Sequence, residues 1–227
     1  MAPKAAQQRR TQAERRSESE EALLNAAAAL IAERGVERAS LASIGESAGA
    51  SRGLPTHHFG SKDGLVARLA GRVQDHFVAA VVDALEQRAH RKPEEVSALD
   101  LLRTTLDTYF ELFEHPTADE RALIVMWGAT FPASASIDGM LEADRRSYDG
   151  WADLIRHGQE DGSIRQDVDA TAAAVALFGL MRGVAALLLT ESDITDMGNV
   201  RTTCDAWIVA ALAAPAAREG GADGDGR

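Results

Sequence analysis

Apolar residues recur every three or four positions along most of the chain, the spacing that places them on one face of an α-helix. Residues 18–34 are a clear example, because Leu23, Ala27 and Ile31 fall on one stripe there. Runs of β-branched residues, which favour strands, are almost absent. The pattern therefore predicts an all-α fold of about nine helices. Their expected positions are residues 18–34, 40–48, 52–58, 61–88, 94–114, 118–131, 136–160, 169–190 and 199–214.

The first third of the chain contains several residues that are typical of helix starts and helix ends. Gly35 follows the first stripe, where glycine is common at a helix C-terminus. Ser40, Ser51 and Ser61 each precede an apolar segment, and a serine there caps the unpaired amides of a first helical turn. Gly49 lies between two short segments, where a left-handed turn residue is needed. These signals predict two short helices at a steep angle between longer ones.

The charged residues are distributed unevenly. The chain of 227 residues carries a formal charge of −11, which by itself argues against a nucleic-acid partner. Residues 1–72, however, hold eleven Lys and Arg against eight Asp and Glu, a net charge of +3, and the remainder is strongly acidic. A small basic module followed by a larger acidic body indicates that only one end of the protein meets a polyanion.

The two short helices have the lengths and the turn chemistry of a helix-turn-helix. Gly45 is small where the first helix has to lie close against the second. The second helix presents Arg52, Thr56 and His57 outward, and Gly53 lets the backbone approach a partner closely. Such side chains reach phosphates and base edges when the N-terminus of a helix enters the major groove of DNA.

The same residues resemble a known family. The order of Glu33-Arg34-Gly35, then SLASIGESAGASRGL, then HHFGSKDGL is similar to the DNA-binding domain of the TetR family of transcriptional repressors, and the resemblance covers residues 18–70. It implies a homodimer with an N-terminal domain that binds double-stranded operator DNA and a C-terminal domain that binds an effector and dimerises. The boundaries we expect are a flexible basic arm at 1–17, the helix-turn-helix domain at 18–65, the effector-binding and dimerisation domain at 66–214, and a disordered tail at 215–227.

The resemblance also implies which residues meet DNA. Family members usually carry a tyrosine where this chain has Thr56 and His57, and leucine or isoleucine where it has Pro55. Lys62 is expected to contact a backbone phosphate, and His58 is expected to pack beneath the domain. The full set of expected DNA-binding residues is Ser40, Ser51, Arg52, Gly53, Thr56, His57, His58 and Lys62.

Metal-binding and enzymatic sites are the alternatives to this interpretation. Adjacent helical positions diverge by about 100°, so His57 and His58 cannot easily converge on one ion. The chain shows no Ser-His-Asp order in a nucleophile elbow, no HExxH, no P-loop and no dinucleotide fingerprint. Glu142, Asp144 and Asp149 could imitate a carboxylate site, but we interpret them as the solvated face of a helix. No metal, cofactor or catalytic residue is predicted, and an all-helical enzyme is the less favoured alternative.

Most aromatic residues lie in the acidic body, several of them paired on one helix face. Such stripes are usually core, but three neighbouring helices direct bulky rings towards one interior. We predict a cavity there for a small hydrophobic effector, with Arg182 as a polar group that favours an anionic or carbonyl-bearing compound. A filled core would instead indicate a helix-turn-helix regulator without a ligand. The expected ligand-binding residues are Tyr109, Phe113, Trp127, Phe131, Tyr148, Trp151, Met181 and Arg182.

The apolar segment at 172–189 is about long enough to span a membrane. Arg182 in its middle would be costly in lipid, so a helix buried between protein neighbours is favoured, and we expect a cytoplasmic protein that does not enter a membrane. Gly179 and Gly183, with nearby alanines, place small residues on one face and allow a second helix to come close. Together with residues 199–214 this helix is predicted to form a four-helix dimer interface.

Overall fold

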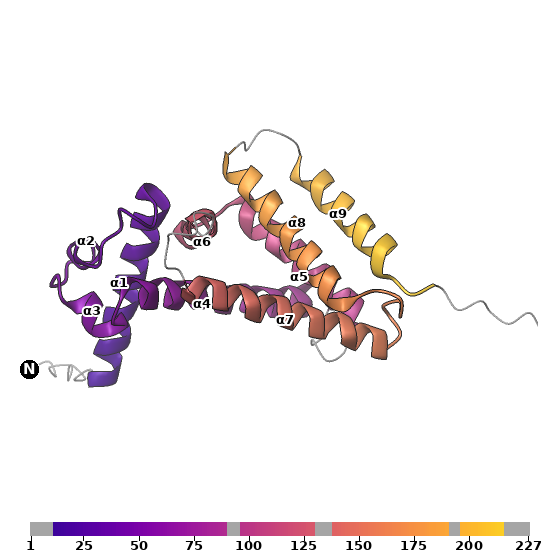
Figure 1. Ribbon diagram of the computed structural model, residues 1–227, viewed down its shortest axis with the longest axis horizontal. Coiled ribbons are helices and arrows are strands. Elements are labelled where there is room, and N and C mark those ends of the chain that lie inside the picture. Colours follow the sequence, from indigo (N-terminus) through magenta and orange to yellow (C-terminus); the bar gives the residue numbers. More distant parts are fainter. Residues whose placement is uncertain (1–10, 90–95, 130–137, 191–195, 216–227) are drawn as a thin grey trace, which may run out of the picture.

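The structure is a computed structural model that describes residues 11–89, 96–129, 138–190 and 196–215. These residues form nine α-helices and no named strand (Figure 1), so the all-α prediction is confirmed. The helices are α1 (Gln12–Arg34), α2 (Leu41–Ser47), α3 (Leu54–Phe59), α4 (Lys62–Ala89), α5 (Ala98–Glu114), α6 (Ala118–Ala129), α7 (Asp138–Glu160), α8 (Ala170–Thr190) and α9 (Met197–Leu212).

The helices form a small N-terminal group and a larger body, and α4 joins the two. In Figure 1, α1, α2 and α3 lie together at one end, and α4 runs from them into the body. There α4 contacts α5, α6 and α7, while α8 packs on α5 and α7, and α9 packs on α5. Among the described helices, α4 is therefore the one that belongs both to the N-terminal group and to the body.

Most of the predicted helix boundaries in the N-terminal group are confirmed. Gly35 follows α1 with a φ of 81°, and Gly49 follows α2 with a φ of 67°. These are left-handed backbone values that glycine adopts without strain. The Ser40 side chain accepts from the Ser43 amide at the start of α2, and the Ser61 side chain accepts from the Gly64 amide at the start of α4.

The first helix begins earlier than we predicted. Thr11 caps it in a capping box, since its hydroxyl accepts from the Glu14 amide and the Glu14 carboxylate accepts from the Thr11 amide. Residues 12–17, expected to belong to a flexible arm, are therefore helical. The rest of that arm, residues 1–10, and the expected tail from residue 216 lie outside the described residues.

The start of α3 also differs from the prediction, because Ser51 does not cap it. The cap position is Gly53, whose carbonyl accepts from the His57 amide. If Ser51 were the cap, Pro55 would occupy the first position whose amide must donate within the helix, and proline has no amide hydrogen. Starting the helix at Leu54 places Pro55 in the first turn, where that hydrogen is not needed.

The turn between α2 and α3 depends on a close approach at Gly45. A Cβ atom added there would lie 2.7 Å from the Ser51 carbonyl oxygen and 3.2 Å from Pro55 Cδ. Gly45 is buried, and the neighbouring Ile44 is completely buried beneath the turn. The prediction that a small residue is needed where these two helices meet is thus consistent with the geometry.

A polar junction ties the N-terminal group to the body. The Arg72 guanidinium of α4 donates to Asn25 Oδ1 of α1 at 2.7 Å and also pairs with Asp119 of α6. The side chains of Arg72 and Asp119 are only 12% and 13% exposed. Helix α1 also packs along α6, and α6 forms part of the cavity described below.

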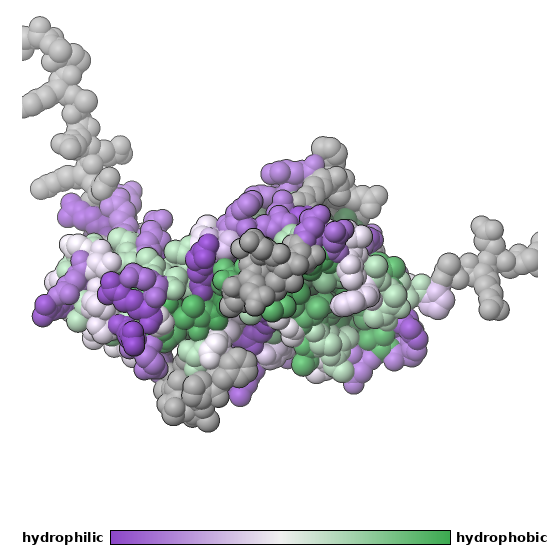
Figure 2. Space-filling view, turned by 90° about the horizontal axis from the view of Figure 1, so that it is seen from above, coloured by the Kyte–Doolittle hydropathy of each residue, from purple (hydrophilic) through white to green (hydrophobic). Residues whose placement is uncertain are grey.

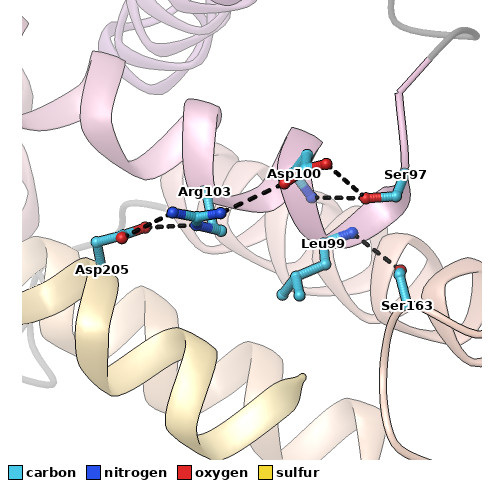
Figure 3. A network of polar contacts seen from close by, with 6 residues as sticks. All are labelled: Ser97, Leu99, Asp100, Arg103, Ser163 and Asp205. Atoms are coloured by element: carbon cyan, nitrogen blue, oxygen red, sulfur yellow. Dashed lines mark hydrogen bonds and ion pairs between the residues drawn. The ribbon is translucent and has the colours of Figure 1, made fainter. Parts of the chain in front are cut away.

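A second polar network holds the start of α5 against α9 (Figure 3). Ser97 caps α5 by accepting from the Asp100 amide, and Asp100 also pairs with Arg103. Arg103 in turn donates two hydrogen bonds to the carboxylate of Asp205 on α9, at 2.6 and 2.9 Å. The Leu99 amide donates to Ser163, which connects α5 to the segment after α7. A bidentate pair of this kind fixes orientation as well as distance.

Candidate DNA-binding surface and effector cavity

The expected DNA-binding residues lie together around α2, α3 and the start of α4. Their outward face is open to solvent, and only two of the eight are half-buried, His58 and Lys62. Thr56 and His57 lie on α3, the helix that a helix-turn-helix inserts into the major groove. The exposed members of the set are Ser40, Ser51, Arg52, Gly53, Thr56 and His57.

The two basic side chains of this set have partners within the domain. Arg52 Nε pairs with a carboxylate oxygen of Glu46 on α2, and both side chains are exposed. Lys62 Nζ donates to the Glu37 backbone carbonyl at 3.2 Å. An exposed ion pair is worth at most about 1 kcal/mol, so a phosphate can displace Glu46 from Arg52 at little cost.

The two histidines have different surroundings. Their ring centroids are 6.0 Å apart and the ring planes are nearly perpendicular. His57 is exposed, whereas His58 is half-buried against Phe59, and its Nδ1 atom is buried with no hydrogen-bond partner among the residues that the structure describes. Among the described residues no group of three or more potential metal ligands is present. This arrangement is consistent with the expectation that His58 packs beneath the domain and His57 faces outward.

The body contains a cavity of about 420 Å³ bounded by α4, α5, α6, α7 and α8. Five of the expected ligand-binding residues line it, and most of its lining is aromatic or aliphatic. Two further aromatic residues line the wall, Phe77 on α4 and Phe178 on α8. The sequence did not indicate them, because neither is paired with a second ring on its own helix. The expected residues that line the cavity are Tyr109, Phe113, Trp127, Trp151 and Met181.

The remaining three expected ligand-binding residues have other positions. Tyr148 does not line the cavity, because its ring packs edge-on against Phe178 with centroids 4.7 Å apart. Phe131 lies outside the described residues. Arg182 lies beside the cavity, with its guanidinium carbon 4.2 Å from the centroid of the Trp127 ring. Five of the eight expected residues therefore line the cavity, Arg182 lies beside it, and Tyr148 does not line it.

A buried ion pair borders the cavity where none was expected. Asp144, which we had assigned to a solvated face, is only 6% exposed. Its carboxylate accepts from Trp127 Nε1 at 3.1 Å and from Arg182 Nη2 at 2.8 Å. Burial raises the pKa of Asp144, while the charge of Arg182 and both hydrogen bonds oppose that rise. The assignment was wrong because the arginine that pairs with Asp144 comes from α8, 38 residues further along the chain.

A larger opening of about 860 Å³ lies between α4, α5 and α9. Charged groups on its walls pair with one another, as in Arg103 with Asp205 and Arg201 with Asp107, the latter at 2.6 Å. Because these charges are already satisfied, this opening offers a small apolar molecule less than the aromatic cavity does. We therefore take the smaller, aromatic cavity as the candidate ligand site.

The outward faces of α8 and α9 are apolar. Val175 on α8 and Trp207 on α9 are 52% and 60% exposed, and Gly179 and Gly183 lie on the same outward side of α8. Figure 2 shows the molecule from above the view of Figure 1. Most of the hydrophobic surface visible in that view lies over the body. The segment Ala170–Leu189 is long and apolar enough to cross a membrane, with a mean hydropathy of 2.1. Its inward face, however, carries Arg182, which is paired with Asp144.

Comparison with known proteins identifies the helix-turn-helix. The model for bacterial regulatory proteins of the tetR family matches residues 23–69. The transcriptional repressor KstR2 of Mycobacterium tuberculosis is 29% identical over 153 residues, which cover 65% of this chain and 70% of KstR2. The transcriptional regulator TtgR of Pseudomonas putida is 27% identical over 225 residues, or 93% of this chain and 99% of TtgR.

The fold agrees with that of a solved structure. SmeT, the efflux-pump repressor of Stenotrophomonas maltophilia, in complex with triclosan superposes with a TM-score of 0.71. The match is 21% identical in sequence and covers 88% of this chain and 93% of SmeT. The helix-turn-helix, the helical body that follows it in the chain and the similarity to these relatives agree with one another. The chain carries the DNA-binding domain of the TetR family of bacterial regulatory proteins at residues 23–69 and is a DNA-binding transcriptional regulator.

Proposed function

We propose that the protein is a cytoplasmic repressor that a small hydrophobic effector releases from a palindromic operator. The observation that carries this proposal is the aromatic cavity, because α4 forms one of its walls. The same helix begins at Lys62, directly after the DNA-reading helix α3. A ligand that fills the cavity therefore acts on the element that sets the position of α3. A cavity of this kind favours an effector-dependent regulator over one without a ligand.

We further propose that the working form is a homodimer. One short recognition helix reads too few bases for specific binding, whereas two related by a two-fold axis read half-sites about one helical turn apart. The apolar outward faces of α8 and α9 are suited to form a four-helix interface with a second copy. An apolar surface of this kind, beside an ion pair on the inward face, is better explained by a protein partner than by lipid.

The DNA-binding surface is tested by removing its positive charges. We expect Arg52→Ala and Lys62→Ala each to weaken operator binding, since each removes a cation from the face that meets phosphate. For Lys62→Ala the slope of log affinity against log salt should fall by about one unit, the loss of about one phosphate contact. Electrophoretic mobility shifts at several salt concentrations measure both effects.

Arg156→Ala is the matched control for these two variants. Arg156 is also an exposed arginine in an ion pair, with Asp153, but it lies on α7, away from the helix-turn-helix. This variant should keep both the wild-type affinity and the salt slope. Unaltered operator binding by Arg52→Ala and Lys62→Ala together would show that another surface reads DNA.

The effector step is tested by filling the cavity. Gly71 on α4 lines it, and a Cβ atom added there meets nothing within 4 Å. Triclosan is a suitable first probe because the similar SmeT fold is known in complex with it. We expect triclosan to change the tryptophan fluorescence of the wild type and to lower operator affinity about 5- to 150-fold over the same concentration range.

Gly71→Leu should bind the operator normally and fail to respond to triclosan, since leucine occupies the space of the ligand. Gly150→Leu is the control, because Gly150 is an exposed helical glycine on α7 that also has open space around it. Release of DNA from Gly71→Leu at the wild-type ligand concentration would place the effector site elsewhere.

A further inference from the structure

We propose that the effector carries an uncharged oxygen acceptor, such as a carbonyl, on a flat apolar framework, and that Tyr109 and Arg182 both donate to it. This inference rests on the proposed function, since it takes the aromatic cavity as the effector site. It narrows the sequence-based expectation, which allowed either an anionic or a carbonyl-bearing compound. Three features of the cavity carry it: two unpartnered donors, a charge that is already neutralised, and a wall of rings.

The two donors lie on neighbouring helices. Tyr109 on α5 lines the cavity and is 5% exposed, and its hydroxyl has no hydrogen-bond partner in the described part of the chain. The Nε atom of Arg182 on α8 is likewise buried without a partner there. Unpartnered buried polar groups are rare in folded proteins, and these two donors lie where a polar group of a ligand in the cavity could satisfy them.

The Tyr109 hydroxyl and the Arg182 guanidinium are close enough to interact electrostatically. Burial raises the pKa of the Tyr109 hydroxyl strongly, and the positive charge of Arg182 lowers it only in part. The hydroxyl therefore keeps its proton at neutral pH and is available as a donor. A guanidinium is always a donor. Two donors near one another call for an acceptor on the ligand.

The acceptor should be neutral because the charge of Arg182 is already balanced. Its Nη2 atom donates to Asp144 at 2.8 Å, and that carboxylate also accepts from Trp127. A carboxylate on the ligand would bring a second negative charge close to Asp144, whose side chain is buried. Two carboxylates that share a buried site disfavour each other's charged form. A carbonyl oxygen accepts from both donors without this penalty.

The framework should be flat because rings form much of the wall. The Tyr109 ring is held by Phe77 and Phe113, with centroids 5.8 and 4.6 Å away, so its hydroxyl has a fixed position. Trp127 and Phe178, whose ring centroids are 5.9 Å apart, add two further rings to the wall. Rings of this kind stack or meet edge-on with an aromatic ligand. The volume of about 420 Å³ suits a compact molecule of a few fused rings.

Three probes that share one tricyclic framework test the inference: fluorene, 9-fluorenone and fluorene-9-carboxylate. They supply no acceptor, a neutral carbonyl and an anionic carboxylate. Equilibrium dialysis against the full-length protein gives their affinities. We expect 9-fluorenone to bind about tenfold more tightly than fluorene, which corresponds to about 1.4 kcal/mol, and the carboxylate to bind more weakly than the ketone.

Tyr109→Phe separates the donor from the shape of the cavity. This variant should lose most of the preference for the ketone over the hydrocarbon, and fluorene should bind it as it binds the wild type. Its Tm should be unchanged or higher, because it removes only a hydroxyl that has no hydrogen-bond partner among the described residues. Tyr148→Phe is the control, since Tyr148 packs against Phe178 outside the cavity, and it should keep the full preference.

The outcomes distinguish this inference from the proposed function. Equal affinity of the wild type for all three probes would overturn the inference while leaving the cavity as a ligand site. Tightest binding of the carboxylate would also overturn it, in favour of an anionic effector. If none of the three binds, the inference fails. The proposed function is tested separately. It is supported if triclosan releases the wild type, but not Gly71→Leu, from the operator.

Discussion

Gly183→Leu is expected to convert the proposed dimer to a monomer and to lower operator affinity by about 10²- to 10⁴-fold. Gly183 lies on the exposed face of α8, and a second copy of α8 can approach closely only if that face stays small. A leucine there holds the two helices apart. Once the subunits separate, each reading helix binds its half-site alone, and the gain from linking two sites is lost.

This variant tests assembly and not folding. A Cβ atom added at Gly183 meets nothing within 4 Å, and leucine favours a helix more than glycine does by close to 1 kcal/mol. The far-UV circular dichroism should therefore be unchanged. Gly150→Leu on α7 is the control and should stay dimeric, because its exposed position lies outside the proposed interface. Sedimentation at micromolar concentration distinguishes the two variants. A wild-type monomer, or a dimeric Gly183→Leu that binds the operator normally, would contradict the proposed interface.

Local signals in the sequence were sufficient to locate most of the helix-turn-helix. Gly35, Ser40, Gly49 and Ser61 act where they were expected, since a cap or a left-handed glycine depends only on residues within one turn. The error at Ser51 has an equally local cause. Pro55 lacks an amide hydrogen, and that excludes the helix start the serine would otherwise have capped.

The candidate ligand site was less predictable because its parts come from five helices. Aromatic pairs on one helix, such as Tyr109 and Phe113, identify a wall of the cavity but not what faces it. Asp144 resembles its solvated neighbours in the sequence, and only the packing of α7 on α8 brings it to Arg182. Long-range pairs of this kind leave no periodic signal, so an isolated arginine in an apolar helix was the one available hint.

Arg182→Met is expected to destabilise the protein by about 3 kcal/mol at neutral pH. Methionine keeps much of the volume but removes the positive charge that faces Asp144 and the stacking on Trp127. Asp144 then remains buried with a single neutral donor. The value lies at the lower end of the range for broken buried pairs, because the Arg182 side chain is 24% exposed.

Two comparisons identify the buried charge as the cause. The double variant Arg182→Met with Asp144→Asn should recover most of the lost stability, since asparagine still accepts from Trp127 and carries no charge. Arg156→Met removes an arginine from an exposed pair with Asp153 and should cost less than about 1 kcal/mol. Urea denaturation at one protein concentration measures all three variants. If the double variant is no more stable than Arg182→Met, lost packing and not an unpaired carboxylate explains the effect.

The penalty in Arg182→Met should also depend on pH. Burial already raises the pKa of Asp144 in the native protein, and Arg182 is the main group that opposes this rise. Without Arg182 the folded-state pKa rises further above the unfolded value of about 3.9. An acid with a raised folded-state pKa contributes its full stability below the unfolded pKa and loses it as pH increases through the folded pKa. We therefore expect Arg182→Met to lie closer to the wild type at pH about 4 than at pH about 7. Each unit by which the substitution raises that pKa should widen the difference by about 1.4 kcal/mol. A gap between the two proteins that stays constant over this range would show that Asp144 does not titrate there.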